Sequence, residues 1–285
     1  MRYQGSIIGA DSRQVYRRLD IGTAKPSKED RGKIPHYLID VAEVEEHFTA
    51  KDYARVAADA IEHIAGQERI PIIVGGAGLY LEALTRGIFE GPGRNKKIRN
   101  RLERRIEMEG TAGLYQRLSQ IDPETAGTIS PADRIRIVRA LEIYESSGQK
   151  PSRLRREGLY AVPDAIYRWV GLEPRREELY RRIDRRVDRM LERGLVAEIR
   201  GLLADGLGDA IKRKKIVGYY EIIDALEKNT SLDNAVDMIK RHSRNYAKRQ
   251  MTWFRNRAAP DWFDPDEDCF GDKVFARLDE YLKRT

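Results

Sequence analysis

Two short apolar runs with an amphipathic segment between them constrain the fold of this chain more than any other feature. Residues 6–10 and 70–74 are rich in small and branched apolar side chains, which is typical of buried strands. Residues 50–66 carry apolar side chains at helical spacing, after Thr49 as an N-cap with Asp52 three residues later. A strand, a helix and a second strand in this order form a right-handed crossover in a parallel sheet. The sequence therefore predicts an α/β fold in which residues 70–74 form a central strand.

A polar cluster follows the first of these strands. Asp11 comes directly after the apolar run and would lie at the C-terminal end of the strand, where parallel α/β sheets bind their ligands. Asp11 is therefore a candidate catalytic carboxylate. An Asp-Ser pair is also common in turns and helix caps, so a purely structural role for Asp11 stays open.

Glycines punctuate the end of the second strand. Residues 75–78 read Gly-Gly-Ala-Gly and precede a predicted helix over residues 79–86. Glycine at such a turn lets the backbone approach a ligand, but it equally allows a helix to pack tightly on a strand. Residues 38–41 are predicted to form another short strand of the sheet.

The pattern changes beyond a Gly-Pro-Gly segment near residue 90. The following residues read as helices with no strand between them, and the chain returns to the sheet at residues 167–172. This shift predicts a helical insertion domain at residues 90–165, within an α/β core formed by residues 1–89 and 166–285. The expected helices of the insertion cover residues 96–109, 112–120, 123–126 and 131–147.

Composition excludes several classes of protein. Cys269 is the single cysteine, so neither a disulfide framework nor a cysteine-based zinc site is possible, as expected for a protein of the reducing cytoplasm. No apolar run reaches the length of about 18 residues that a membrane helix needs, so no membrane partner is predicted. A hydrophobic content of 41% in 285 residues is enough to bury a core.

The positive charge lies in the later part of the chain. Residues 1–90 contain 12 Lys and Arg against 14 Asp and Glu, whereas residues 91–285 contain 41 against 32. This distribution indicates that the later part binds a polyanion, although salt-bridged helices would give the same count.

Three helical segments carry arginines in regular positions. Residues 175–193 form an amphipathic helix in which Arg182, Arg186, Arg189 and Arg193 flank the apolar stripe. Arg136 and Arg139 share one helical face and can reach phosphates together. Near the C-terminus basic residues are interleaved with aromatic ones, which suits a nucleic acid with unstacked bases, although these aromatic side chains could equally belong to the core. These C-terminal residues are Arg241, Arg244, Tyr246, Lys248, Trp253, Phe254 and Arg255.

Two segments resemble the signature of one enzyme family. Residues 10–16, Ala-Asp-Ser-Arg-Gln-Val-Tyr, and residues 20–26, Asp-Ile-Gly-Thr-Ala-Lys-Pro, are similar to those of the tRNA dimethylallyltransferases, also called tRNA isopentenyltransferases. Further similar segments follow in the family's order at residues 34–40, 71–80, 133–142, 217–219 and 246–255.

The resemblance implies a P-loop-NTPase-like parallel sheet core and an all-α insertion domain that contacts tRNA. The sequence pattern itself predicts a helical C-terminal part with an interruption at residues 212–218. The family's Gly-x-x-x-x-Gly-Lys-Ser/Thr loop and the strand before it do not occur in these 285 residues. The first strand and the phosphate loop are therefore expected to be missing from the core.

The resemblance also implies a reaction and its participants. A dimethylallyl group would pass from dimethylallyl diphosphate to the exocyclic amine of the adenosine next to the anticodon, with Mg²⁺ as cofactor and the anticodon stem-loop of tRNA as partner. Asp11 matches the general base and Arg186 the arginine that grips the diphosphate, and metal ligands cannot be named. Matches to tRNA-contacting positions are Asp11, Ser12, Arg13, Gln14, Arg99, Ile135, Arg136, Ile137, Val138, Arg139, Val217, Gly218, Tyr219, Lys248, Arg249, Gln250, Met251, Thr252, Trp253, Phe254 and Arg255.

The sequence departs from the family at three contact positions. Ala77 stands where the family usually has threonine, Ile135 where glutamine is common, and Tyr220 where a basic residue is usual. Two alternative functions stay open: a truncated, catalytically inactive tRNA-binding homologue, and a nucleotide or small-molecule kinase of similar architecture. Because no other segment replaces the phosphate loop, we expect negligible transfer by residues 1–285 alone, and we expect a monomer.

Overall fold

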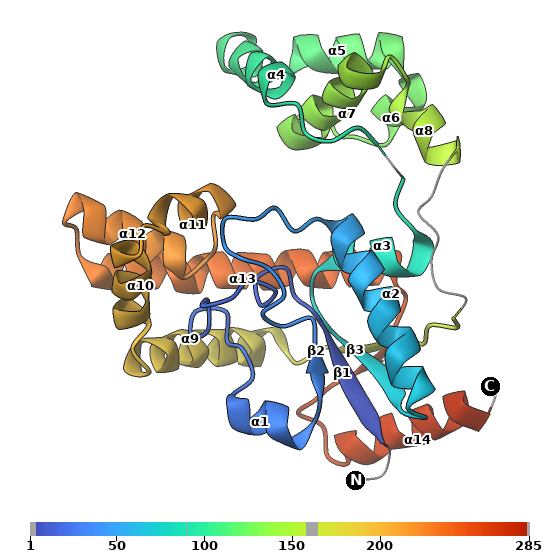
Figure 1. The fold of residues 1–285 in the computed structure, drawn as a ribbon, viewed down its shortest axis with the longest axis vertical. Helices are drawn as coiled ribbons and strands as arrows, with labels where there is room; N and C mark the ends of the chain where they lie inside the picture. Colours follow the sequence, from blue (N-terminus) through green and yellow to red (C-terminus); the bar gives the residue numbers. More distant parts are fainter. Residues whose placement is uncertain (1–3, 90, 158–164, 284–285) are drawn as a thin grey trace. The chain divides into compact units, whose positions relative to one another are not determined.

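A small parallel sheet and many helices make up this α/β protein, and the computed structural model describes residues 4–89, 91–157 and 165–283 (Figure 1). The chain divides into a core unit, Met1–Thr85 with Pro163–Thr285, and a helical unit, Arg86–Val162. The sequence predicted this division at residues 90 and 165; residue 90 and residues 158–164 lie outside the described residues.

The part of the main sheet that the structure describes has three parallel strands. Strand β1 (Gly5–Ala10) lies in the centre, with β2 (His36–Tyr37) on one side and β3 (Ile70–Gly75) on the other. The predicted parallel arrangement is therefore confirmed, but the prediction that residues 70–74 form a central strand is wrong. Within the described residues β3 is an edge strand, and its Ile72 and Val74 side chains are exposed.

The strand predicted at residues 38–41 is also wrong. The backbone of Leu38 has a φ of 62° and that of Asp40 a φ of 58°, both in the left-handed region that extended strands do not adopt. Strand pairing therefore ends at Tyr37, and the following residues form a bend.

Helix α2 (Ala50–Gly66) forms as predicted. Thr49 caps it by accepting a hydrogen bond from the Asp52 N–H, and the Asp52 side chain accepts one from the Thr49 N–H, which is a complete capping box. Its buried face, which includes Tyr53, packs on β1 and β3. The Tyr53 ring stacks on that of Tyr80, with 4.4 Å between their centroids.

Residues 167–172 were expected to rejoin the main sheet, and this expectation is wrong. Strand β4 (Val170–Leu172) instead pairs in parallel with β5 (Asp261–Phe263) in a separate two-stranded sheet. Trp262 of β5 packs so closely on Gly171 that a Cβ atom at that glycine would lie 2.5 Å from the indole ring. Strand β5 was not predicted, because a strand of three residues is too short to show a recognisable sequence pattern.

The rest of the core unit is helical. Helix α9 keeps its predicted apolar stripe, with Ile183, Val187 and Met190 buried. The predicted interruption at residues 212–218 is shorter than expected, because residues 212–214 still belong to α11. These helices are α1 (Lys28–Lys33), α3 (Gly78–Arg86), α9 (Arg176–Glu192), α10 (Leu195–Ala204), α11 (Gly208–Lys214), α12 (Tyr219–Lys228), α13 (Leu232–Arg257) and α14 (Phe270–Lys283).

The helical unit has its own hydrophobic core, which includes Leu102, Leu118, Ile137 and Leu141. Four of its described helices lie where they were predicted, whereas a fifth, α8, was not predicted. They are α4 (Lys96–Glu109), α5 (Ala112–Ile121), α6 (Pro123–Gly127), α7 (Arg134–Ser147) and α8 (Pro151–Glu157).

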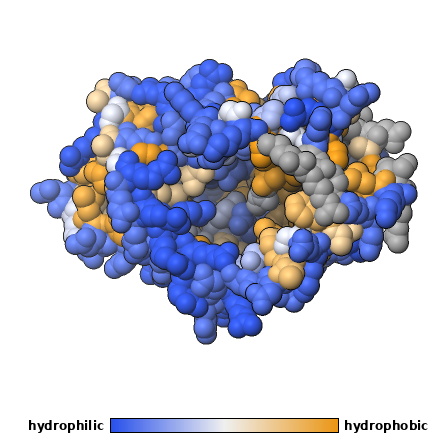
Figure 2. Space-filling view, turned by 90° about the horizontal axis from the view of Figure 1, so that it is seen from below, coloured by the Kyte–Doolittle hydropathy of each residue, from blue (hydrophilic) through white to orange (hydrophobic). Residues whose placement is uncertain are grey.

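Hydrophilic residues dominate the face shown in Figure 2, where apolar residues lie in separate patches. Charged residues make up 35% of the chain, which agrees with this surface. No helix in the described parts of the chain combines the length and apolarity that crossing a membrane requires.

Candidate active site and RNA-contacting residues

Asp11 lies at the C-terminal end of β1, as predicted, and a turn orients its carboxylate. One oxygen, Oδ1, accepts hydrogen bonds from the backbone N–H groups of Arg13 at 2.7 Å and Gln14 at 3.3 Å. Within residues 4–89, 91–157 and 165–283, no donor is bound to the second oxygen, Oδ2. The turn therefore fixes the carboxylate through one oxygen and leaves the other available to a ligand.

The charge of Asp11 acts on side chains of three helices. Burial lowers the pKa of Arg186 on α9, whereas the nearby Asp11 carboxylate raises it. Burial and then the Asp11 charge raise the pKa of Tyr246 on α13, and burial raises that of Tyr80 on α3, to which Asp11 also contributes. No ion pair joins Asp11 to Arg186 in the described structure. Carboxylate and guanidinium are thus close enough to interact while both keep free polar atoms.

The glycine turn after β3 is explained by packing. A Cβ atom on Gly75 would lie 2.2 Å from the carbonyl oxygen of Ala10, and one on Gly78 would lie 2.4 Å from the Trp253 ring. A Cβ atom on Gly76 would collide with Gln250, whose Nε2 donates to the Gly76 carbonyl at 3.0 Å. The glycines therefore let α13 lie against the end of the sheet, next to the strand that carries Asp11.

The loop at residues 19–25 supports the Asp11 turn. The Gln14 side chain, predicted to contact tRNA, donates from Nε2 to the carbonyl oxygens of Thr23 at 3.0 Å and Ala24 at 3.2 Å. Glu198 on α10 accepts the Ile21 N–H at 2.8 Å. Sequence reasoning missed Glu198, because no local pattern marks a carboxylate that binds a loop so distant in the chain.

Lys25 anchors the other end of this loop. Its side chain is 2% exposed, and Nζ donates to the carbonyl oxygen of Tyr16 at 2.6 Å, to Asp20 at 2.8 Å and to Asp40 at 2.5 Å. Arg31 donates to the other oxygen of Asp40 at 2.9 Å. Burial raises the pKa of Asp40, but the bonds and charges of Lys25 and Arg31 outweigh it and hold that pKa below its usual value. The Lys-Pro part of the signature is therefore structural in this chain.

The predicted contact residues on α13 divide into exposed and packed side chains. Lys248, Arg249, Thr252 and Arg255 are exposed, whereas Gln250, Met251, Trp253 and Phe254 are partly buried. The Arg249 guanidinium lies over the Tyr246 ring, and Arg255 forms an ion pair with Glu173. Lys248 is the clearest free cation of the set in the described residues.

The structure buries the side chain of Tyr219, one of the predicted contact residues. Its side chain is fully buried, and its hydroxyl donates to Glu198 at 2.6 Å. The Gly218 N–H donates to Glu221 at 2.8 Å, and Val217 is half-buried. The Tyr219 side chain is therefore part of the core.

The segment at residues 135–139 in the helical unit is likewise divided. Ile137 and Val138 are buried in the hydrophobic core, so the predicted contact of this segment with tRNA would not involve their side chains. Ile135 is 74% exposed and the Arg136 side chain 64% exposed. Arg139 and the predicted Arg99 both bind the buried Glu142, which the sequence did not reveal as a site residue.

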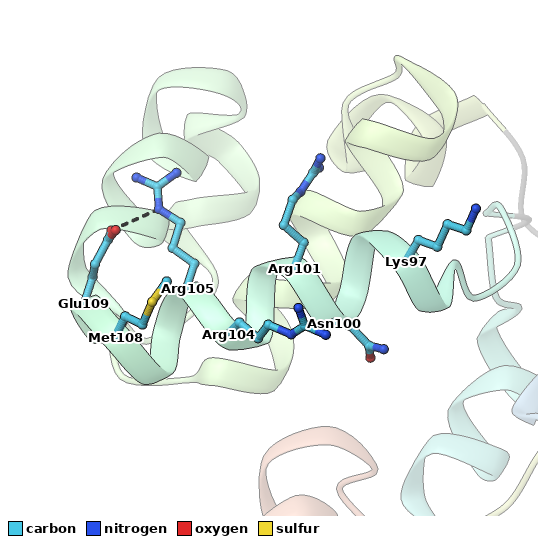
Figure 3. A pocket seen from close by; sticks show the side chains of 7 residues that line it. All are labelled: Lys97, Asn100, Arg101, Arg104, Arg105, Met108 and Glu109. Atoms are coloured by element: carbon cyan, nitrogen blue, oxygen red, sulfur yellow. Dashed lines mark hydrogen bonds and ion pairs between the residues drawn. The ribbon is translucent and has the colours of Figure 1, made fainter.

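A cationic surface lies on α4. Figure 3 shows the side chains that line a hollow on this helix, namely Lys97, Asn100, Arg101, Arg104, Arg105, Met108 and Glu109. Arg105 is paired with Glu109 at 3.0 Å, and Arg101 with Glu145. All of these residues come from one helix and are exposed, so the hollow is an open surface and not an enclosed site.

No group of three or more His, Cys, Asp or Glu side chains in the described residues could hold a metal ion. Mg²⁺ in phosphate chemistry commonly binds one or two carboxylates together with substrate phosphates and water. The side chains around Asp11 therefore fit an ion brought by a phosphate ligand better than one held in a protein cage.

Comparison with known proteins identifies the family. The sequence profile of the family described as IPP transferase matches residues 14–257. The tRNA dimethylallyltransferase 2 of Geotalea uraniireducens is 43% identical over 268 residues, 93% of this chain and 86% of the relative. The tRNA dimethylallyltransferase 1 of Citrifermentans bemidjiense is 48% identical over 252 residues, 88% of this chain and 80% of the relative.

Two solved structures agree with these sequence matches. The full-length tRNA isopentenylpyrophosphate transferase from Bacillus halodurans has a TM-score of 0.65 at 38% identity, covering 99% of this chain and 88% of that one. A eukaryotic dimethylallyltransferase acting on tRNA has a TM-score of 0.76 at 26% identity, covering 99% of this chain and 74% of that one. The chain belongs to the IPP transferase family.

Proposed function

We propose that this protein is a tRNA dimethylallyltransferase, which transfers the dimethylallyl group of dimethylallyl diphosphate to the exocyclic amine of the adenosine next to the anticodon. The observation that carries the proposal is the free Oδ2 of Asp11, beside the Arg186 guanidinium, at the end of a parallel strand. Relatives named as transferases over most of their length favour this function over the inactive homologue and the kinase.

Asp11 supplies the general base. The amine of adenine is a weak nucleophile because its lone pair is delocalised into the ring. As the new C–N bond forms and the bond between the dimethylallyl carbon and the diphosphate oxygen breaks, Oδ2 accepts the amine proton. The two N–H groups on Oδ1 keep the carboxylate oriented throughout this step.

Arg186 stabilises the leaving diphosphate, on which negative charge builds in the transition state. The Asp11 carboxylate favours the charged form of this guanidinium, so the positive charge is retained next to the reacting groups. When Mg²⁺ is bound, it offsets further charge on the diphosphate, and we propose that the diphosphate oxygens hold most of its coordination sphere.

We further propose that the main sheet is the P-loop-NTPase-like core of the family and that tRNA is bound with its target adenine flipped out of the stack. The parallel strands and the position of Asp11 at a strand's C-terminal end support the first proposal. Among the predicted contact residues, the exposed Arg136 and Lys248 and the partly exposed Arg13 are cations that suit RNA phosphates.

The function is tested by mass spectrometry of an anticodon stem-loop after incubation with dimethylallyl diphosphate and Mg²⁺. Two forms of the protein are compared: residues 1–285, and the same residues preceded by a phosphate-binding segment of the family pattern. We expect a mass gain of one dimethylallyl group with the second form and negligible gain with the first. No gain with either form would contradict the proposed function, and equal gain with both would contradict the need for the added segment.

Replacing Arg186 by alanine is expected to slow transfer about 10²-fold, because one preorganised cation no longer faces the leaving group. Rates are compared in single-turnover experiments with the form of the protein that turns over faster. Arg185→Ala is the matched control, since Arg185 is the neighbouring residue on the same helix and is bound to Glu178 at 2.9 Å. A similar rate loss in both variants would show that α9 tolerates no arginine replacement and would remove the specific role of Arg186.

A further inference from the structure

A buried carboxylate joins two predicted RNA contacts in the helical unit. Glu142 lies on α7 and its side chain is fully buried. Its Oε2 accepts hydrogen bonds from Arg99 at 2.9 Å and from Arg139 at 3.1 Å, and its Oε1 accepts the backbone N–H of Asn95 at 2.8 Å. One side chain therefore fixes both guanidinium groups and the beginning of α4.

The two arginines are drawn together although they carry the same charge. Burial raises the pKa of Glu142, but the bonds from Arg99, Asn95 and Arg139 outweigh it and lower the pKa, so the carboxylate is ionised at neutral pH. One negative charge against two positive charges leaves an excess of one positive charge. Without the carboxylate, the guanidinium groups would repel each other and separate.

Both arginines keep donors that Glu142 does not use. Each guanidinium has five N–H groups, and the side chains of Arg99 and Arg139 are 20% and 34% exposed. Among the described residues the Nε–H of Arg99 has no hydrogen-bond partner but is shielded from solvent, and its Nη1 lies 3.9 Å from a Glu103 oxygen. Arg139 also donates to the carbonyl oxygen of Pro92 at 2.8 Å. The protein thus orients the two groups without consuming their capacity to bind an anion.

We propose that Glu142 is a positioning residue that holds Arg99 and Arg139 as the two arms of one anion site, and that this site binds a backbone phosphate of the tRNA. The proposal rests on the proposed function, which makes tRNA the substrate. A phosphate has several acceptor oxygens and can bridge two guanidinium groups, each of which binds oxyanions in a bidentate manner. A phosphate contact fixes the register of the RNA and carries no base preference.

Glu145 provides a matched control on the same helix. Its side chain is 9% exposed and also binds two arginines, Arg101 and Arg117, the latter at 2.6 Å. Neither arginine is a predicted RNA contact. Glu142→Gln and Glu145→Gln therefore remove the same charge from similar surroundings and differ in which arginines they release.

The test measures binding of an anticodon stem-loop by both variants over a range of salt concentrations. Each substitution removes one negative charge and so raises the net charge of the protein by one, which by itself strengthens binding to RNA. We expect E145Q to bind as tightly as the original protein or slightly more tightly. We expect E142Q to bind about 10-fold more weakly, with the salt slope lower by about one, because one phosphate contact is lost.

Steady-state kinetics and urea unfolding separate positioning from stability. E142Q should raise KM and leave kcat unchanged, because the lost contact binds substrate and transition state equally. A loss of stability shared by E142Q and E145Q would not raise KM while leaving kcat unchanged. If the loss of affinity parallels the loss of stability in these variants, Arg99→Lys and Arg139→Lys provide a second test. Lysine keeps the positive charge but lacks the planar guanidinium that binds a phosphate in a bidentate manner, so each substitution should weaken RNA binding.

The outcomes that overturn the proposal are distinct from those that overturn the function. Failure of the original protein to bind the stem-loop would contradict the proposed function and this site with it. Binding by the original protein, with E142Q as tight as E145Q, would overturn the anion site alone. An equal loss of affinity in E142Q and E145Q would make the arginines of α4 and α7 structural.

Discussion

Replacing Asp11 by asparagine is expected to slow dimethylallyl transfer by about 10²–10⁴-fold, the range that a positioned general base contributes. Asparagine keeps an acceptor oxygen for the N–H groups of Arg13 and Gln14, so the turn after β1 should persist. The variant loses the oxygen that accepts the amine proton. Single-turnover transfer to the stem-loop measures the rate, and binding of the same RNA without donor should be unchanged.

The control is the other carboxylate close to Tyr80. Asp52 also raises the pKa of Tyr80, but its Oδ2 is committed to the backbone N–H of Thr49 at 2.8 Å and to the Thr49 hydroxyl at 2.6 Å. Asp52→Asn should therefore lower stability slightly through the helix cap and leave the transfer rate intact. If Asp52→Asn abolished transfer and Asp11→Asn did not, the base would have been assigned to the wrong carboxylate.

The sequence was sufficient to predict the elements whose cause is local. The capping box of Thr49 and Asp52 marks the start of α2, and the apolar stripe that includes Val187 defines the buried face of α9. It was insufficient at residues 38–41, because the left-handed backbone of Leu38 and Asp40 depends on contacts from distant residues.

The predicted site was limited in the same way. A resemblance between segments does not reveal which side chains face the core, and for this reason the burial of Ile137, Val138 and Tyr219 was not foreseen. The carboxylates of Glu142 and Glu198 were missed because Arg99 lies 43 residues from Glu142 and Ile21 lies 177 residues from Glu198 in the sequence. Such networks exist only after folding has brought the segments together.

Replacing Lys25 by methionine is expected to destabilise the protein by about 3 kcal/mol, near the lower limit for breaking a buried ion pair. Methionine fills a similar volume, so the loss comes from the carboxylate and carbonyl groups left without their ammonium partner. The lower limit applies because the Asp40 side chain is 30% exposed and retains its ion pair with Arg31 in the variant. Urea unfolding measures the change, and Lys33→Met, which removes an exposed lysine paired with Glu29, should cost at most about 1 kcal/mol.

Acid should diminish the difference between Lys25→Met and the original protein. Because Lys25 and Arg31 hold the pKa of Asp40 below its usual value, the ionised carboxylate stabilises the fold above its unfolded pKa, about 3.9, and this contribution is lost as pH falls through the folded pKa. Because the variant lacks the Lys25 contact, protonation of Asp40 lowers its free energy of unfolding by less. The difference in free energy of unfolding should be constant between about pH 5 and 8 and decrease below about pH 4. A difference that grew on acidification would mean that Lys25 stabilises the loop through its carbonyl contact with Tyr16 and not through Asp40.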